Sequence, residues 1–265
     1  MRGQLLIRRE RTASALPDLP ARVSGWPLKV ERPAHGNRLR ISVEHGHARL
    51  VWPLRIGAAS ALAFFEKHRG WLEQTVRVYR QAEDRAAADL VLDPRWPGRV
   101  PWFGHLRPIH FETGAARLDV DAKELRCRVP QGAQAAPRVV QRLLIAGLGD
   151  ALAMRARVWL REYEPQVRAR CQGLRIRPMR TLWGSLSPQG AIALNLALAF
   201  ADETLAEYVL VHELAHFVAR DHSPRFWETV AQLYPDYPQR RRELNREHRY
   251  LQALLRRLYR EHEHP

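Results

Sequence analysis

The stretch "VLVHELAHFVARDHSPRFW", residues 209–227, brings three histidines and one glutamate together between His212 and His222. His212 and His216 are four residues apart. On an α-helix this spacing turns the side chain by about 400°, so both imidazoles project from one face, one turn apart. Glu213 follows His212 directly and is rotated from it by about 100°. The two imidazoles can therefore bind one ion, and the carboxylate lies beside that ion and not among its ligands.

This HExxH arrangement meets the needs of zinc-dependent hydrolysis, which uses two nitrogen ligands and a glutamate as general base for a zinc-activated water. A catalytic zinc ion has three protein ligands and an open fourth position. His222 supplies a third nitrogen where the chain should leave the helix. We therefore expect His212, His216 and His222 to bind one zinc ion per chain, with Glu213 as the base. The alternative is chance occurrence of the motif on an amphipathic helix, since the chain has 12 histidines.

The residues around the motif predict two helices and a preceding β-hairpin. Asp202 is a suitable N-cap for the first helix, and Ser223 followed by Pro224 suits the start of a second one. Upstream, residues 174–180 and 190–198 alternate as strands do, and the residues between 187 and 190, "SPQG", are typical of a turn. We expect a hairpin that leads into the helix carrying the motif.

The rest of the chain predicts an α+β fold with one change of character near residue 132. Residues 1–20 are expected to form a flexible arm, and residues 21–132 a β-rich N-terminal region. Within that region we expect strands at 106–112, 116–120 and 124–129 and a helix over about 58–80. From Pro137 the apolar positions recur every three or four residues, which predicts a long amphipathic helix. Residues 133–265 would then form a helical domain that carries the motif.

Composition suggests a cytoplasmic protein. No run of the sequence approaches the about 20 apolar residues that a membrane helix requires, and the first 20 residues are too charged for a signal peptide. The two cysteines, Cys127 and Cys171, lie far apart and do not suggest a disulfide framework. We expect no membrane association.

The chain is strongly basic, with a formal net charge of +15 and a pI near 10.9. Such a charge favours binding to nucleic acid or another polyanion. However, only Lys29, Lys67 and Lys123 among the 43 basic residues are lysines. An arginine excess in an alanine-rich chain is also what a GC-rich genome produces. Both explanations stay open.

Three stretches carry a resemblance to a known family: "MRTLWGSLSPQGAIALNLAL" (179–198), "YVLVHELAHFVARDHSPRFW" (208–227) and "YPDYPQRR" (234–241). They resemble the YgjP-like metallopeptidases, which are SprT-like zincins, and the His-x-Pro-x-Phe element is similar to that of Spartan-type DNA-dependent proteases. The resemblance is strong over residues 175–240 and weaker over 28–80. It implies a zincin-like metallopeptidase domain in residues 133–265, a protein or peptide substrate, and the roles given above for the three histidines and Glu213.

Two residues depart from the pattern of that family. Members usually carry Arg before the Trp and Cys after the Ser of the "WGS" element, where this chain has Leu182 and Leu186. The departures concern substrate handling and not zinc binding.

Further candidates have an ordinary structural explanation beside the functional one. Trp183 and Asn195 are candidates for substrate binding next to the helix of the motif, or for core and strand positions. Tyr234 and Tyr237 could donate a hydrogen bond to an oxyanion, or only pack. His248 is expected to be a solvated residue of a charged C-terminal helix.

Three functions follow from these observations. The first is an active zinc peptidase. The second is a nucleic-acid-associated module of the SprT or Spartan type, in which DNA binding dominates. The third is a zinc-binding protein without turnover, suggested by Leu182 and Leu186.

Overall fold

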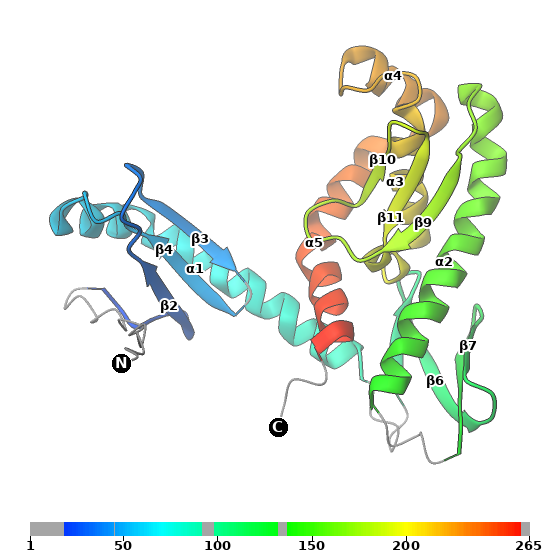
Figure 1. Cartoon of the computed structure of the whole chain (residues 1–265), viewed down its shortest axis with the longest axis horizontal. Coiled ribbons are helices and arrows are strands. Elements are labelled where there is room, and N and C mark those ends of the chain that lie inside the picture. The colour runs from blue at the N-terminus through cyan, green and yellow to red at the C-terminus, as the bar shows by residue number, and fades with distance from the viewer. Residues whose placement is uncertain (1–18, 45, 92–97, 132–136, 261–265) are drawn as a thin grey trace, which may run out of the picture. The chain divides into compact units, whose positions relative to one another are not determined.

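The computed structural model describes residues 19–44, 46–91, 98–131 and 137–260, and the chain divides into two compact units, Met1–Gln81 and Ala82–Pro265 (Figure 1). The division falls inside helix α1 (Ala58–Asp89) and not near residue 132 as the sequence suggested. The expected arm at residues 1–20 lies almost wholly outside the described residues. Leu19, at its end, is buried in the core of the first unit.

The first unit is a four-stranded sheet with the N-terminal part of α1. Its strands are β1 (Arg22–Val23), β2 (Trp26–Glu31), β3 (Arg40–Glu44) and β4 (His47–Val51), in the order β1-β2-β4-β3. The β3–β4 pair is an antiparallel hairpin, and β2 runs parallel to β4. Leu50 and Trp52 share a core with Phe65 and Leu72 of the helix.

The second unit begins with a sheet that the sequence assigned to the N-terminal region. It contains β5 (Gly98–Trp102), β6 (His105–Thr113), β7 (Arg117–Val120) and β8 (Leu125–Val129), in the order β5-β6-β8-β7. Strands β6, β7 and β8 confirm the three expected strands. Helix α2 (Pro137–Val167) packs against β7 and β8. Leu118 and Leu125 therefore share one core with Leu144 and Leu148, and this shared core explains why the units do not divide near residue 132.

A second, three-stranded sheet lies beside α2 and has the order β10-β11-β9 (Figure 1). Its strands are β9 (Gly173–Arg177), β10 (Gly184–Leu186) and β11 (Ala191–Asn195). The expected hairpin exists, but its first strand is β10, because β9 pairs with β11 in parallel. The strand expected at 190–198 ends at Asn195, whose side chain accepts a hydrogen bond from the amide of Ala197 and caps the 3-10 helix η2 (Leu196–Ala199).

Three helices complete the second unit: α3 (Glu203–Ala215), α4 (Pro224–Leu233) and α5 (Tyr237–Arg260). Asp202 caps α3 as expected, since its carboxylate accepts a hydrogen bond from the amide of Thr204. Helix α3 packs against α2, α5 and β10 and is buried on most of its surface. The fold is α+β. In the part of the chain that the structure describes, every helix is too short or too polar to cross a membrane.

Candidate metal and catalytic site

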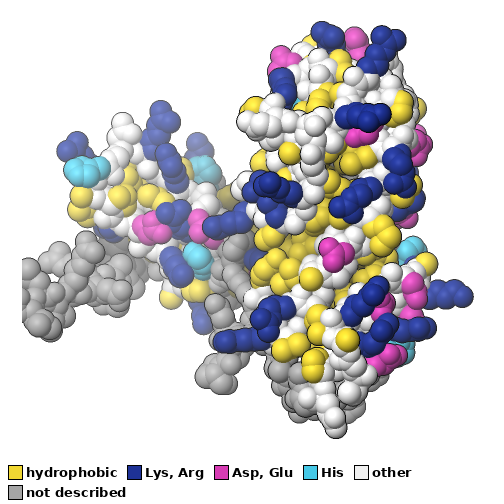
Figure 2. Space-filling view, turned by 45° about the vertical axis from the view of Figure 1, so that its right-hand side comes forward, with side chains coloured by type: hydrophobic (Ala, Val, Ile, Leu, Met, Phe, Trp, Pro, Cys, Tyr) yellow, Lys and Arg dark blue, Asp and Glu magenta, His cyan; other side chains and the backbone are white. Residues whose placement is uncertain are grey.

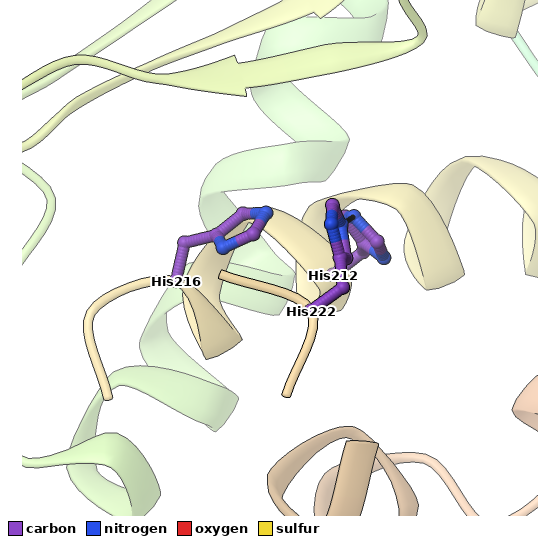
Figure 3. A group of neighbouring side chains, drawn as sticks. All are labelled: His212, His216 and His222. Carbon is purple, nitrogen blue, oxygen red and sulfur yellow. Dashed lines mark hydrogen bonds between the residues drawn. The ribbon is translucent and has the colours of Figure 1, made fainter. Parts of the chain in front are cut away.

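The three histidines of the motif converge at the corner between α3 and α4 (Figure 3). His212 lies in the last turn of α3, and His216 caps the helix with α-helical dihedral angles, φ −66° and ψ −13°. The helical spacing of the two residues is therefore kept although α3 ends at Ala215. His222 comes from the turn before α4. One nitrogen of each ring lies within 4.8 Å of the others.

The donor set fits a zinc ion. Zinc binds imidazole nitrogen at about 2.0–2.1 Å in a tetrahedral arrangement, which places two ligand nitrogens about 3.4 Å apart. The Nε2 atoms of His212 and His222 are 3.1 Å apart. Burial lowers the pKa of His212 to about 3, and it also lowers the pKa of His216. Neutral imidazoles are the form that binds a metal, so the environment of these two rings favours ligation.

Neighbouring groups set the orientation of the rings. The Nδ1–H of His216 donates a hydrogen bond to the carbonyl of Ala219 at 3.1 Å in the tautomer that leaves Nε2 free for a metal. The fully buried ring of Phe226 contacts all three imidazoles, with centroid distances of 4.8 Å to His212, 4.5 Å to His216 and 4.8 Å to His222. The position of Phe226 under the three rings follows from the packing of α4 on α3.

Glu213 lies on α3 and is buried against strand β10, with 5% of its surface exposed. Burial raises the pKa of its carboxyl to about 8, against the opposing effect of a hydrogen bond from the backbone amide of Leu186. Gly184 provides the space for this carboxyl group, because a Cβ atom at position 184 would lie 2.6 Å from Oε1 of Glu213. Gly184 does not have a positive φ, so the close approach and not the backbone conformation requires glycine here. Nothing in the sequence indicated this role of the glycine in "WGS", because the contact joins two segments that meet only in the fold.

Two further polar side chains are buried among the described residues, Asn195 and Gln252, and both hold the loop that leads into β10. The Asn195 amide donates to the carbonyls of Met179 and Leu182, each at 2.8 Å. Gln252 of α5 donates to the same Met179 carbonyl at 3.3 Å. Asn195 is 0% exposed, so its side chain serves the loop and is not presented to a substrate.

The remaining candidates are distributed around this loop and the helix ends. Trp183 is half-buried and meets His248 edge-on at 5.2 Å. His248 is itself half-buried and burial lowers its pKa, so the expectation of a solvated residue was wrong. The Tyr234 hydroxyl donates toward Thr204 and Glu207 of α3, at 3.3 Å and 3.4 Å. Tyr237 stacks on Trp227 at 5.5 Å.

The two departures from the family pattern differ in their surroundings. The Leu182 side chain is 53% exposed, so an arginine at this position would have room in solvent. Leu186 is half-buried and packs against the core of the second unit. Neither departure alters the three histidines. The group that contacts Glu213 is the backbone amide of Leu186 and not its side chain.

Two histidines four residues apart on a helix, with a glutamate after the first, are the arrangement of HExxH metallopeptidases. Comparison with family descriptions gives the same class, because residues 37–247 match the YgjP-like metallopeptidase domain. The match covers most of the chain, which therefore belongs to the YgjP-like metallopeptidase family. Among solved structures, the chain is similar to the metallopeptidase zymogen of Pyrococcus abyssi abylysin, with 27% identity and a TM-score of 0.31 over 34% of this chain and 92% of that one. No curated protein matches the chain.

Proposed function

We propose that this metallopeptidase depends on zinc, with His212, His216 and His222 as ligands and Glu213 as the general base. The observation that supports the proposal is the convergence of three imidazole nitrogens within 4.8 Å, next to a carboxyl group that is almost fully buried. A structural cluster of histidines would not need a buried carboxyl group at its side, since burying a carboxyl group is unfavourable.

Zinc bound at the three histidines would act as a Lewis acid, lower the pKa of a bound water, and favour the ionised form of Glu213. Glu213 would accept a proton from the attacking water and pass it to the leaving amine of the peptide. Gly184 and the Leu186 amide hold the carboxyl group in place for both transfers. Burial under β10 shields these transfers from bulk water.

Strand β10 also offers a place for the substrate backbone. It is an end strand in the described sheet, with β11 on one side only, and α3 packs beside it. The unpaired amides and carbonyls of an end strand bind an extended peptide by adding it as a further strand. A peptide added to β10 would lie beside Glu213.

The Glu213→Gln variant tests this proposal. Glutamine keeps the size of the side chain but cannot accept a proton at neutral pH, so hydrolysis of casein should fall by about a hundredfold to ten-thousandfold. Zinc content and melting temperature should stay close to those of the wild type, because Gln and Glu have similar helix propensities. Hydrolysis at the wild-type rate in a zinc-loaded variant would show that Glu213 is not the base.

Nucleic-acid binding is the other function that the basic charge suggested. On the face drawn in Figure 2, Lys and Arg side chains are spread among acidic and apolar ones and do not form one continuous stripe. Several arginines are paired with carboxylates, including Arg85 with Glu247 and Arg240 with Glu243. Local pairing reduces the charge available for phosphate groups, so these observations favour the peptidase.

A further inference from the structure

A stack of aromatic rings beside the histidines ends on an exposed arginine. The Trp227 ring is 5.8 Å from the His222 ring, with 28° between their planes, and 5.9 Å from the His212 ring. Tyr237 stacks on Trp227 with an interplanar angle of 20°. The Arg241 guanidinium lies over the same indole, with Cζ 4.7 Å from the ring centroid. The Trp227 ring therefore separates the Arg241 guanidinium from His212 and His222, two of the three candidate metal ligands.

Arg241 is restrained and has no anionic partner among the described residues. Stacking on the Trp227 indole already restrains the Arg241 side chain, so less rotamer freedom is lost when Arg241 binds a ligand. Its neighbour Arg240 differs, because that guanidinium donates to Glu243 at 2.7 Å. The N–H donors of Arg241 are left for an anion that the chain does not supply, and a guanidinium binds a carboxylate with two parallel hydrogen bonds.

We propose that Arg241 is a specificity-determining residue that binds a carboxylate of the substrate close to the scissile bond. The proposal rests on the peptidase function proposed above. Because the guanidinium is one ring removed from His212 and His222, its distance suits a group flanking the scissile bond better than the scissile carbonyl itself. The carboxylate belongs either to an Asp or Glu side chain beside that bond or to a free C-terminus just after it.

Matched peptides test the proposal on the zinc-loaded full-length protein. The scissile bond is first located by mass spectrometry of digested casein. Quenched fluorescent peptides then carry Glu, Gln or Lys on one or the other side of that bond, and a second pair ends in a free or an amidated C-terminus. We expect kcat/KM to be about tenfold higher for the carboxylate peptide of one of these sets than for its neutral counterpart. Which set shows the preference identifies the source of the carboxylate.

Three variants assign the preference to one residue. Arg241→Gln should bring the carboxylate and neutral peptides to equal kcat/KM, and Arg241→Glu should favour the Lys peptide. Arg242→Gln is the matched control, because Arg242 is also exposed on α5 and points about 100° away from Arg241. The control should keep the wild-type preference. A wild type without any preference, or a preference that survives in Arg241→Gln, would overturn the proposal.

A binding measurement separates this proposal from the peptidase function itself. The zinc-loaded Glu213→Gln variant is titrated with the same peptides by calorimetry, with and without Arg241→Gln. If the wild type hydrolyses neither casein nor a peptide, the proposed function fails. Peptides with a central Glu, Gln or Lys and a free or an amidated C-terminus are then titrated, and the ratio of their dissociation constants still decides whether Arg241 binds a carboxylate. Tighter binding of the carboxylate peptide that disappears with Arg241→Gln supports the assignment, and equal binding contradicts it.

Discussion

The two sides of Glu213 are built from different parts of the chain. On one side, the three histidines come from a single short segment, and the end of α3 with the following turn brings them together. On the other side, β10 covers the carboxyl group and depends on Asn195 of β11 and Gln252 of α5. In the proposed function, the first region binds the metal, whereas the second positions the group that uses it. Metal binding and catalysis should therefore be separable by mutation.

The largest effect is expected in the histidine region. Loss of an outer hydrogen-bonding partner of a metal ligand costs about tenfold to hundredfold in metal affinity, and loss of a ligand should cost more. His222→Ala should therefore lose most of its zinc on dialysis, as measured by elemental analysis, and lose hydrolysis with it. His248→Ala is the control, since it removes a half-buried histidine outside the cluster. One zinc ion per chain in His222→Ala would place the third ligand elsewhere.

A smaller effect, confined to catalysis, is expected in the second region. In Gly184→Ala the new methyl group would occupy the space of the Glu213 carboxyl group and displace it. Misplacement by about 1 Å can cost about a hundredfold in rate, so kcat should fall by about tenfold to a hundredfold while zinc content stays unchanged.

Gly173→Ala is the matched control for this change. Gly173 lies in β9 of the same sheet, and a Cβ atom there would meet Ala191 at an ordinary distance of 3.8 Å. Steady-state kinetics and elemental analysis of both variants decide the outcome. Equal kcat values for Gly184→Ala and Gly173→Ala would break the distinction between the two regions.

Asn195→Ala should act on stability more than on chemistry. The substitution leaves the Leu182 carbonyl and the Ala197 amide without their Asn195 partner, whereas the Met179 carbonyl keeps its hydrogen bond from Gln252. Each unsatisfied buried group costs about 1–3 kcal/mol, so we expect the free energy of unfolding in urea to fall by about 2–4 kcal/mol. Hydrolysis should fall by less than in Gly184→Ala, with zinc retained. Asn245→Ala, at an exposed position of α5, should change stability by less than about 0.5 kcal/mol.

The smallest effect on hydrolysis is expected from added nucleic acid, because it would bind to neither the three histidines nor the region around β10. Duplex DNA added at about 50 mM salt should change the rate of peptide hydrolysis by less than about twofold, and any binding should weaken steeply toward about 200 mM salt. Fluorescence titration of labelled DNA measures the binding. Tight binding with strong stimulation of hydrolysis would favour a nucleic-acid-associated peptidase of the Spartan type.

The fold was predictable where local signals agree with the packing. Alternation and turn residues indicated β6, β7 and β8. The Asp202 cap and the Ser223–Pro224 pair indicated where α3 and α4 begin, although the Ser223 side chain makes no capping hydrogen bond. The pairing of β9 was not predictable, because an alternating pattern specifies which face of a strand is buried and not which strand it pairs with. The division into two units was not predictable either, because it depends on the packing of α2 against the sheet of β5 to β8.

For the site, the sequence alone determined the chemistry of the donors. The arrangement of His212 and His216 on one face follows from the pitch of an α-helix, and Glu213 lies beside them, so the roles proposed for these residues need no knowledge of the rest of the fold. Only the tertiary structure decided what surrounds them: Phe226 under the rings, Gly184 against the carboxyl group, and Arg241 above Trp227. The physical reason is that helical spacing is a local property of the backbone. Burial and close contact depend on segments that meet only when the chain folds.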